Sequence, residues 1–178
     1  MPYKEREGHI QLIAHGFFDG TEGHANDDYN GSLVYQSSNK IEQKMFKKLI
    51  ERSKFGIFKP SMNNIGNYSL PAILTQLIMK HYKIHNLSSR KAKFSSIIMN
   101  KLKINTKCRN AVLKAAFIDE GSCGKKKVRD NLSVFSSINL KLIKQISEIL
   151  KISEYKFFIS GYNTTSIYLY AKSLQKFY

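Results

Sequence analysis

Residues 12–23 read LIAHGFFDGTEG, and residues 112–122 read VLKAAFIDEGS. Each stretch is an apolar run of helical length that ends in an acidic turn containing glycine. Small side chains on one face of each run would let two helices approach closely; these are Ala14, Gly16, Ala115 and Ala116. We therefore expect residues 9–19 and 110–119 to pack against each other near a pseudo-twofold axis.

The segment that follows each acidic turn is also repeated. Residues 33–38 read LVYQSS and residues 132–137 read LSVFSS, an offset of 99 residues, and an amphipathic helical pattern follows each copy. Self-similarity of this kind indicates a tandem duplication, with each unit built as helix, hairpin, helix and hairpin. The sequence therefore predicts an α+β fold of two pseudosymmetric αββαββ units with antiparallel sheets.

The first unit is expected at residues 1–87 and the second at 107–178, joined by a helical linker at 88–106. Apolar periodicity predicts helices at 39–52, 70–85, 88–104 and about 139–150. Ser88 or Ser89 would be the N-cap of the helix in the linker. Runs rich in β-branched and aromatic residues predict strands at 32–37, 55–59, 131–136, 155–160 and 166–171.

Composition excludes several classes of protein. The 178 residues are 42% hydrophobic and 24% charged, which is typical of a globular chain and not of a disordered one. No stretch approaches the roughly 20 apolar residues of a membrane span, and no secretory signal opens the chain. Cys108 and Cys123 are too few for a disulfide framework or a metal site. We expect a cytoplasmic protein in a reducing compartment, with no membrane partner.

The balance of charge points to a polyanionic partner. Lys and Arg number 29 against 13 Asp and Glu, which gives a net charge of +16. An excess of this size attracts polyanions, most often nucleic acid. A host proteome rich in Lys and Asn would also raise the charge, and the chain would then be an interaction domain without a nucleic-acid partner.

The two acidic turns, with the strand, the Ser-Ser pair and the helix after each, resemble the LAGLIDADG homing endonucleases. The resemblance covers about residues 7–174, in the single-chain, two-repeat form of that family. It implies a monomer that cleaves double-stranded DNA at a specific site with Mg²⁺ as cofactor. The alternative is a similar protein that binds DNA or RNA without cutting, such as a regulator or a maturase.

Four of the acids lie at the two turns: Asp19, Glu22, Asp119 and Glu120. Converging carboxylates repel one another unless divalent cations lie between them, and Mg²⁺ prefers oxygen ligands. In the family the metal-binding acid precedes a glycine, which favours Glu22 and Glu120 as catalytic metal ligands. Asp19 and Asp119 are further candidate ligands, or they cap and pack the helix ends. Lys172 is the cation expected to stabilise developing charge.

Spacing differs between the two turns. Two residues separate the acids of the first turn and none separates those of the second, whereas family motifs usually have one. The resemblance places DNA on the face of each sheet, in the major groove. The hairpin after the second acidic turn contains Lys125, Lys126, Lys127 and Arg129, which would either contact DNA or form a solvent-exposed run of charge. The corresponding residues 24–30 of the first unit are acidic. The candidate DNA-binding residues are Lys125, Lys126, Lys127, Arg129, Lys54, Lys59, Asn63, Lys156, Tyr162 and Asn163.

Overall fold

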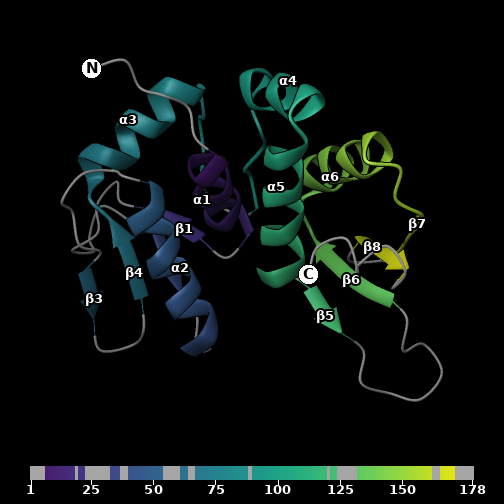
Figure 1. Cartoon of the computed structure of the whole chain (residues 1–178), viewed down its shortest axis with the longest axis horizontal. Helices are drawn as coiled ribbons and strands as arrows, with labels where there is room; N and C mark the ends of the chain where they lie inside the picture. The colour runs from purple at the N-terminus through teal and green to yellow at the C-terminus, as the bar shows by residue number, and fades with distance from the viewer. Residues whose placement is uncertain are drawn as a thin grey trace.

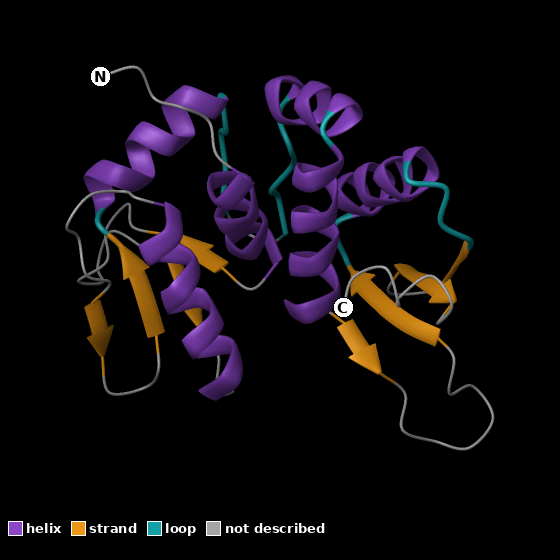
Figure 2. Cartoon of the chain, in the orientation of Figure 1, coloured by secondary structure: helices purple, strands orange, loops and turns teal. Residues whose placement is uncertain are grey.

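Two similar units make up the protein, and they lie side by side in Figure 1. The computed structural model describes residues 7–18, 20–22, 33–36, 40–53, 61–63, 67–87, 90–119, 121–123, 132–161 and 165–170. Each unit contains two helices and a four-stranded antiparallel sheet (Figure 2). Two further helices, α3 (Ala72–Tyr82) and α4 (Ser96–Ile104), connect the units.

Both units follow the same order of elements. The first contains α1 (Glu7–Phe18), β1 (Gly20–Glu22), β2 (Leu33–Gln36), α2 (Lys40–Ser53), β3 (Ser61–Asn63) and β4 (Asn67–Leu70). The second contains α5 (Thr106–Asp119), β5 (Gly121–Cys123), β6 (Leu132–Ser137), α6 (Leu140–Ile152), β7 (Phe157–Ser160) and β8 (Thr165–Tyr170). The strand orders are β1-β2-β4-β3 and β5-β6-β8-β7. The predicted α+β fold of two αββαββ units is therefore confirmed.

Strand register corrects the offset between the repeats. Tyr35 lies opposite the first residue of β1, and Phe135 lies opposite the first residue of β5. The next helices begin at Lys40 and at Leu140. The structural offset is therefore 100 residues in this segment, one more than the sequence motifs indicate.

Helices α1 and α5 pack together in the centre of the molecule and make the most extensive contact between any two described elements (Figure 1). Ala14 and Ala115 are both 0% exposed, so small side chains allow the close approach. A Cβ added to Gly16 would lie 2.7 Å from a methyl carbon of Leu33, so a larger residue would have to displace that side chain where α1 meets its own sheet. The predicted packing is confirmed for residues 9–18 and 110–119.

The predicted helix at 88–104 is too long at its start. Helix α4 begins only at Ser96, and the hydroxyl of Ser95 caps it by accepting a hydrogen bond from the Ile98 N–H. Ser88 and Ser89 lie outside the described residues. Residues 83–87 and 90–95, here called the strap, connect α3 to α4 without helical structure. The side chain of Gln145 explains this, because it bonds both the N–H and the C=O of Phe94, at 2.8 and 2.7 Å.

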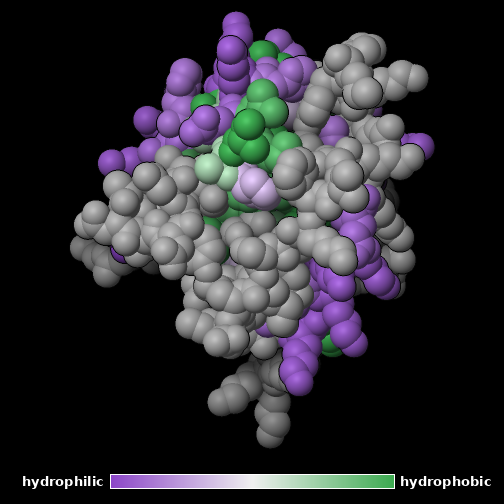
Figure 3. Space-filling model, turned by 90° about the vertical axis from the view of Figure 1, so that its left-hand side faces the viewer, coloured by the Kyte–Doolittle hydropathy of each residue, from purple (hydrophilic) through white to green (hydrophobic). Residues whose placement is uncertain are grey.

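Other elements agree with the predictions in part. Helix α3 ends earlier than expected because Lys83 adopts a left-handed conformation with φ 51°. Its outer face keeps Ile73 and Leu77 exposed, and Figure 3 shows a hydrophobic patch with a hydrophilic border on this side. The strand predicted at 55–59 lies outside the described residues, and β3 and β4 were not predicted. The longest described helices have 14 residues, too few to cross a membrane.

Candidate active site at the ends of the motif helices

A single residue separates the first helix of each unit from its first strand. Helix α1 ends at Phe18 and β1 begins at Gly20. Helix α5 ends at Asp119 and β5 begins at Gly121. Because the two helices pack side by side and both lead into their sheets, the two junctions are structurally equivalent (Figure 1).

The residues at these junctions are Asp19 and Glu120, and both lie outside the described residues. This equivalence differs from the motif spacing, which favours Glu22 and Glu120. Glu22 is the last residue of β1, opposite Leu33, and its counterpart in β5 is Cys123. The register therefore pairs Glu120 with Asp19 and leaves Glu22 without an acidic counterpart.

Asp119 has well-defined partners in the other unit. Its side chain is 0% exposed, and its Oδ2 accepts a hydrogen bond from His15 Nδ1 at 2.7 Å. Its Oδ1 accepts a hydrogen bond from the Tyr35 hydroxyl at 3.0 Å. Helix α1 and strand β2 therefore hold the end of α5 through both carboxylate oxygens.

An aromatic cluster supports this network. The ring of Tyr35 stacks on Phe46, with centroids 4.1 Å apart and planes 13° from parallel. The imidazole of His15 meets both rings edge-on, at 5.7 and 6.0 Å. All three side chains are buried, so the donors to Asp119 have little freedom to turn away.

The same positions are apolar on the other side of the pseudo-twofold axis. Phe18 is the counterpart of Asp119, and its ring packs edge-on against Phe135, the counterpart of Tyr35, at 5.4 Å. Ala116 is the counterpart of His15 by the same register. The interface between the units is therefore polar on one side and apolar on the other.

Only part of the predicted DNA-binding set lies in the described regions. Asn63 is in β3, and Lys156 is exposed directly before β7. The following candidates lie outside the described residues: Lys54, Lys59, Lys125, Lys126, Lys127, Arg129, Tyr162, Asn163 and Lys172. Across the described strands of both sheets, Glu22 is the one charged residue.

The second sheet has an aromatic cluster on the face opposite its helices. Ile167 and Leu169 are buried toward the core, so the alternate residues of β8 point to the other face. There Phe158 stacks on Tyr168 at 4.7 Å and contacts Tyr170 at 6.0 Å. Phe158 is 40% exposed and Tyr170 is 46% exposed. The sequence analysis missed these residues, although their alternation along the strands is a detectable signal.

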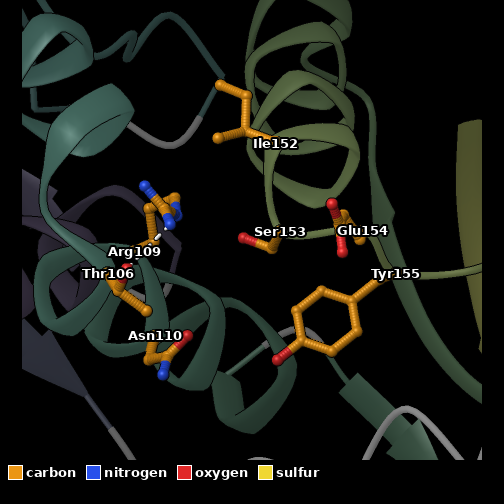
Figure 4. A pocket seen from close by; sticks show the side chains of 7 residues that line it. All are labelled: Thr106, Arg109, Asn110, Ile152, Ser153, Glu154 and Tyr155. Atoms are coloured by element: carbon orange, nitrogen blue, oxygen red, sulfur yellow. Dashed lines mark hydrogen bonds between the residues drawn. The ribbon is translucent and has the colours of Figure 1, made fainter.

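A separate cavity of about 380 Å³ lies between the start of α5 and the end of α6 (Figure 4). Arg109 lines it and donates hydrogen bonds to the carbonyls of Leu102 and Lys103 and to the Thr106 hydroxyl. Burial raises the pKa of the Tyr155 phenol, and the nearby Arg109 charge partly opposes the rise. The cavity is at the opposite end of α5 from Asp119, so it is not part of the acidic site.

His15 and Tyr35 were also missed by the sequence analysis. The detectable signal is a histidine within an otherwise apolar motif. The correspondence of Tyr35 with Phe135 appears only in the strand register, because the sequence repeat aligns Tyr35 with Val134. Within the described part of the chain, no group of three His, Cys, Asp or Glu side chains is arranged to hold a metal ion.

Comparisons with known proteins identify the fold. No protein-family model matches the chain, and no curated protein sequence does. The homing endonuclease I-WcaI bound to its DNA recognition sequence matches with a TM-score of 0.64 and 16% identity, over 100% of this chain and 81% of that one. I-DmoI in complex with DNA and Mn matches at 0.57 and 12%, over 97% and 95%. The N-terminal LAGLIDADG domain of WhiA matches at 0.55 and 14%, over 99% and 82%.

These matches show the fold class of the chain. The chain has the fold of the LAGLIDADG homing endonucleases, as the resemblance of its two motifs predicted. Two of the neighbours, I-WcaI and I-DmoI, are described as bound to DNA, and I-DmoI also with Mn, Mg or Ca ions. Identity of 12–16% establishes the fold, and the activity has to be argued from this chain's own residues.

Proposed function

We propose that this protein is a site-specific, divalent-metal-dependent endonuclease that cuts double-stranded DNA as a monomer. The observation that supports this most is the pair of equivalent helix–strand junctions, each of which contains one acid. Asp19 and Glu120 follow directly after Phe18 and Asp119, the last residues of two helices packed side by side. Each of the two equivalent junctions would therefore supply one carboxylate ligand, one for the cut in each DNA strand.

The proposed metal ligands are Asp19 and Glu120, and Glu22 is the alternative to Asp19 in the first unit. Their donor atoms are carboxylate oxygens, which suit Mg²⁺ and leave room for phosphate oxygens. Asp119 is less suited, because His15 and Tyr35 already occupy both of its oxygens. When bound, a divalent ion would polarise the scissile phosphate and lower the pKa of the attacking water.

The remaining residues bind and orient the DNA. The sheet faces opposite the helices would lie in the major groove, where base edges are distinguishable. Phe158, Tyr168 and Tyr170 would contact bases there, because apolar and aromatic side chains recognise the thymine methyl group. Lys125–Lys127 and Arg129 would contact phosphates, and Lys172 would stabilise charge at the scissile group.

Cleavage of a library of randomised duplexes in Mg²⁺, with sequencing of the cut ends, tests the proposal. The wild-type protein should cut both strands at one preferred site. Asp19→Asn and Glu120→Gln should abolish cutting and keep DNA affinity, since each removes a carboxylate that repels phosphate. Glu22→Gln is the matched control and should still cut. Loss of cutting in Glu22→Gln together with retention in Asp19→Asn would instead assign Glu22 as the ligand.

A second candidate function is sequence-specific binding without cleavage. The unequal spacing of acids in the two turns favours it, and so does the similarity to a LAGLIDADG domain of WhiA. In that case the wild-type protein would select one duplex from the library and leave it uncut in either Mg²⁺ or Mn²⁺. Tyr168→Ala should weaken selection in both cases, because it removes a proposed base contact.

A further inference from the structure

Most of the net positive charge of this protein arises in one part of the chain, because that part contains no acid. From residue 52 to residue 118 there are 13 Lys or Arg and no Asp or Glu. The described elements in this stretch are β3, β4, α3, the strap, α4 and most of α5. Lys54 and Lys59 lie outside the described residues, and the other Lys and Arg residues of this stretch lie on helices or on the strap.

The strap exposes its cations and buries its apolar residues. Ile84, Leu87, Ala92 and Phe94 are each at most 5% exposed, and they anchor the segment to the core. The cationic side chains between these anchors are exposed: Lys83, Arg90, Lys91 and Lys93, with His85. A buried row thus alternates with a basic row that faces solvent.

Tertiary contacts hold the strap in place. The side chain of Gln145 bonds both backbone groups of Phe94, and the Asn139 amide donates to the Ala92 carbonyl at 2.7 Å. The Phe94 ring packs against Phe17, with centroids 5.0 Å apart. Because the backbone is already ordered, little conformational entropy remains to be lost when the basic row binds a partner.

The strap lies among the helices. In Figure 2 α3 and α4 lie in the upper part of the molecule, the strap runs down between them, and the strands of both sheets lie in the lower part. Among the described residues after the strap, Glu148 pairs with Lys103 at 3.2 Å, at the α4–α6 contact, and Glu154 follows α6. The strap itself contains no acid to neutralise its cations.

We infer that the strap is a second nucleic-acid-binding surface, which contacts the phosphodiester backbone of a segment other than the one on the sheets. An ordered row of exposed cations without interspersed acids is suited to phosphate contacts, which position a nucleic acid without reading its sequence. The protein could then hold two nucleic-acid segments at once. This inference does not require cleavage activity.

Two-colour fluorescence cross-correlation tests whether one protein molecule holds two segments. A green-labelled duplex DNA is mixed with a red-labelled probe, either a second duplex or an RNA hairpin, at equimolar protein. Sedimentation velocity verifies one protein chain per complex. We expect coincident green and red signals, and the probe that gives coincidence identifies DNA, RNA or their shared backbone as the partner. Absence of coincidence with both probes would overturn the inference.

Two variants with equal charge changes locate the surface. The strap variant is Arg90→Ala/Lys91→Ala/Lys93→Ala, and the control is Lys44→Ala/Lys47→Ala/Lys48→Ala on α2, all at exposed positions. The strap variant should lose coincidence and keep binding of a single duplex, whereas the control should keep both. Equal losses of coincidence in the two variants would show that the effect depends only on net charge, and would refute the inference.

Salt dependence gives an independent measurement on the second probe. Each phosphate contact contributes about 0.9 to the slope of log K against log salt for duplex DNA, so the strap variant should flatten the slope by up to about 2.7. An unchanged slope in the strap variant would contradict the inference. If the strap variant instead loses all duplex binding, the strap alone holds DNA, and the proposed interface on the sheets would be wrong.

Discussion

Replacing Asp119 by Ala should lower the free energy of unfolding by about 3–5 kcal/mol, because two hydrogen bonds to a buried carboxylate are lost and each bond to a charged group contributes about 1.5–3 kcal/mol. The carboxylate is 0% exposed and accepts hydrogen bonds from His15 at 2.7 Å and from Tyr35 at 3.0 Å. Without it, a buried imidazole and a buried phenol lose their acceptor. In a chain of this size the melting temperature should fall by roughly 6–20 °C.

A double-mutant cycle separates the contact from general damage to the core. Tyr35→Phe alone should cost about 1 kcal/mol, because Asp119 keeps its bond to His15. The double variant Tyr35→Phe/Asp119→Ala should lose about 1–2 kcal/mol less free energy of unfolding than the sum of the two single losses. Urea unfolding followed by circular dichroism measures all three values. Additivity within about 0.5 kcal/mol would refute a direct interaction.

The apolar side of the interface supplies the control for this cycle. Phe18 occupies the position equivalent to Asp119 and packs on Phe135 instead of Tyr35. Phe18→Leu should therefore destabilise the protein without any coupling to Tyr35→Phe. Coupling of similar size in both pairs would mean that the cycle reports a general rearrangement of the interface.

Three further predictions concern other parts of the fold. Gly16→Ala should cost about 1–3 kcal/mol in urea unfolding, because its Cβ would lie 2.7 Å from Leu33; the cost of Gly16→Ala should be smaller in a Leu33→Ala background, and an unchanged stability of Gly16→Ala would contradict the close approach. Asn139→Ala should cost about 2–3 kcal/mol, since it removes both the cap of α6 and the bond to the Ala92 carbonyl; a loss below about 0.5 kcal/mol would show that neither bond contributes. Burial raises the pKa of Tyr155, so its neutral phenol should contribute fully to the free energy of unfolding below about pH 10, and this contribution should be lost as the pH rises further. The free energy of unfolding should decline less with rising pH in Tyr155→Phe than in the wild type, and identical profiles would contradict the shift.

Local patterns in the sequence were sufficient for the general architecture. The apolar motifs with their small residues predicted that α1 and α5 pack together, because close helix packing needs short side chains on the facing surfaces. The helical periodicity of α2 and α6 and the β-branched, aromatic runs of β6 and β8 are equally local signals. Repetition of the whole pattern then predicted two units of the same kind.

Elements without such signals depend on their partners in the fold. Strands β3 and β4 have the sequences SMN and NYSL, which contain no β-branched residue, and they exist because β4 pairs with both β2 and β3. The strap fits a helical apolar pattern, but Gln145, 51 residues away, bonds the backbone of Phe94 and excludes the helix there. Propensity carries no information about a hydrogen bond of this range.

At the acidic site, too, one part was predictable from local sequence and another part depended on the tertiary structure. The sequence by itself was enough to identify candidate ligands at two turns, because four acids in two glycine-containing turns stand out in a basic chain. It could not determine which acids are equivalent, since that depends on where each helix ends. Helix α5 ends at Asp119, whose carboxylate is held by His15 and Tyr35 of the other unit, 104 and 84 residues earlier. Contacts this distant in sequence arise only when the two units pack, so tertiary structure sets the register of the two junctions.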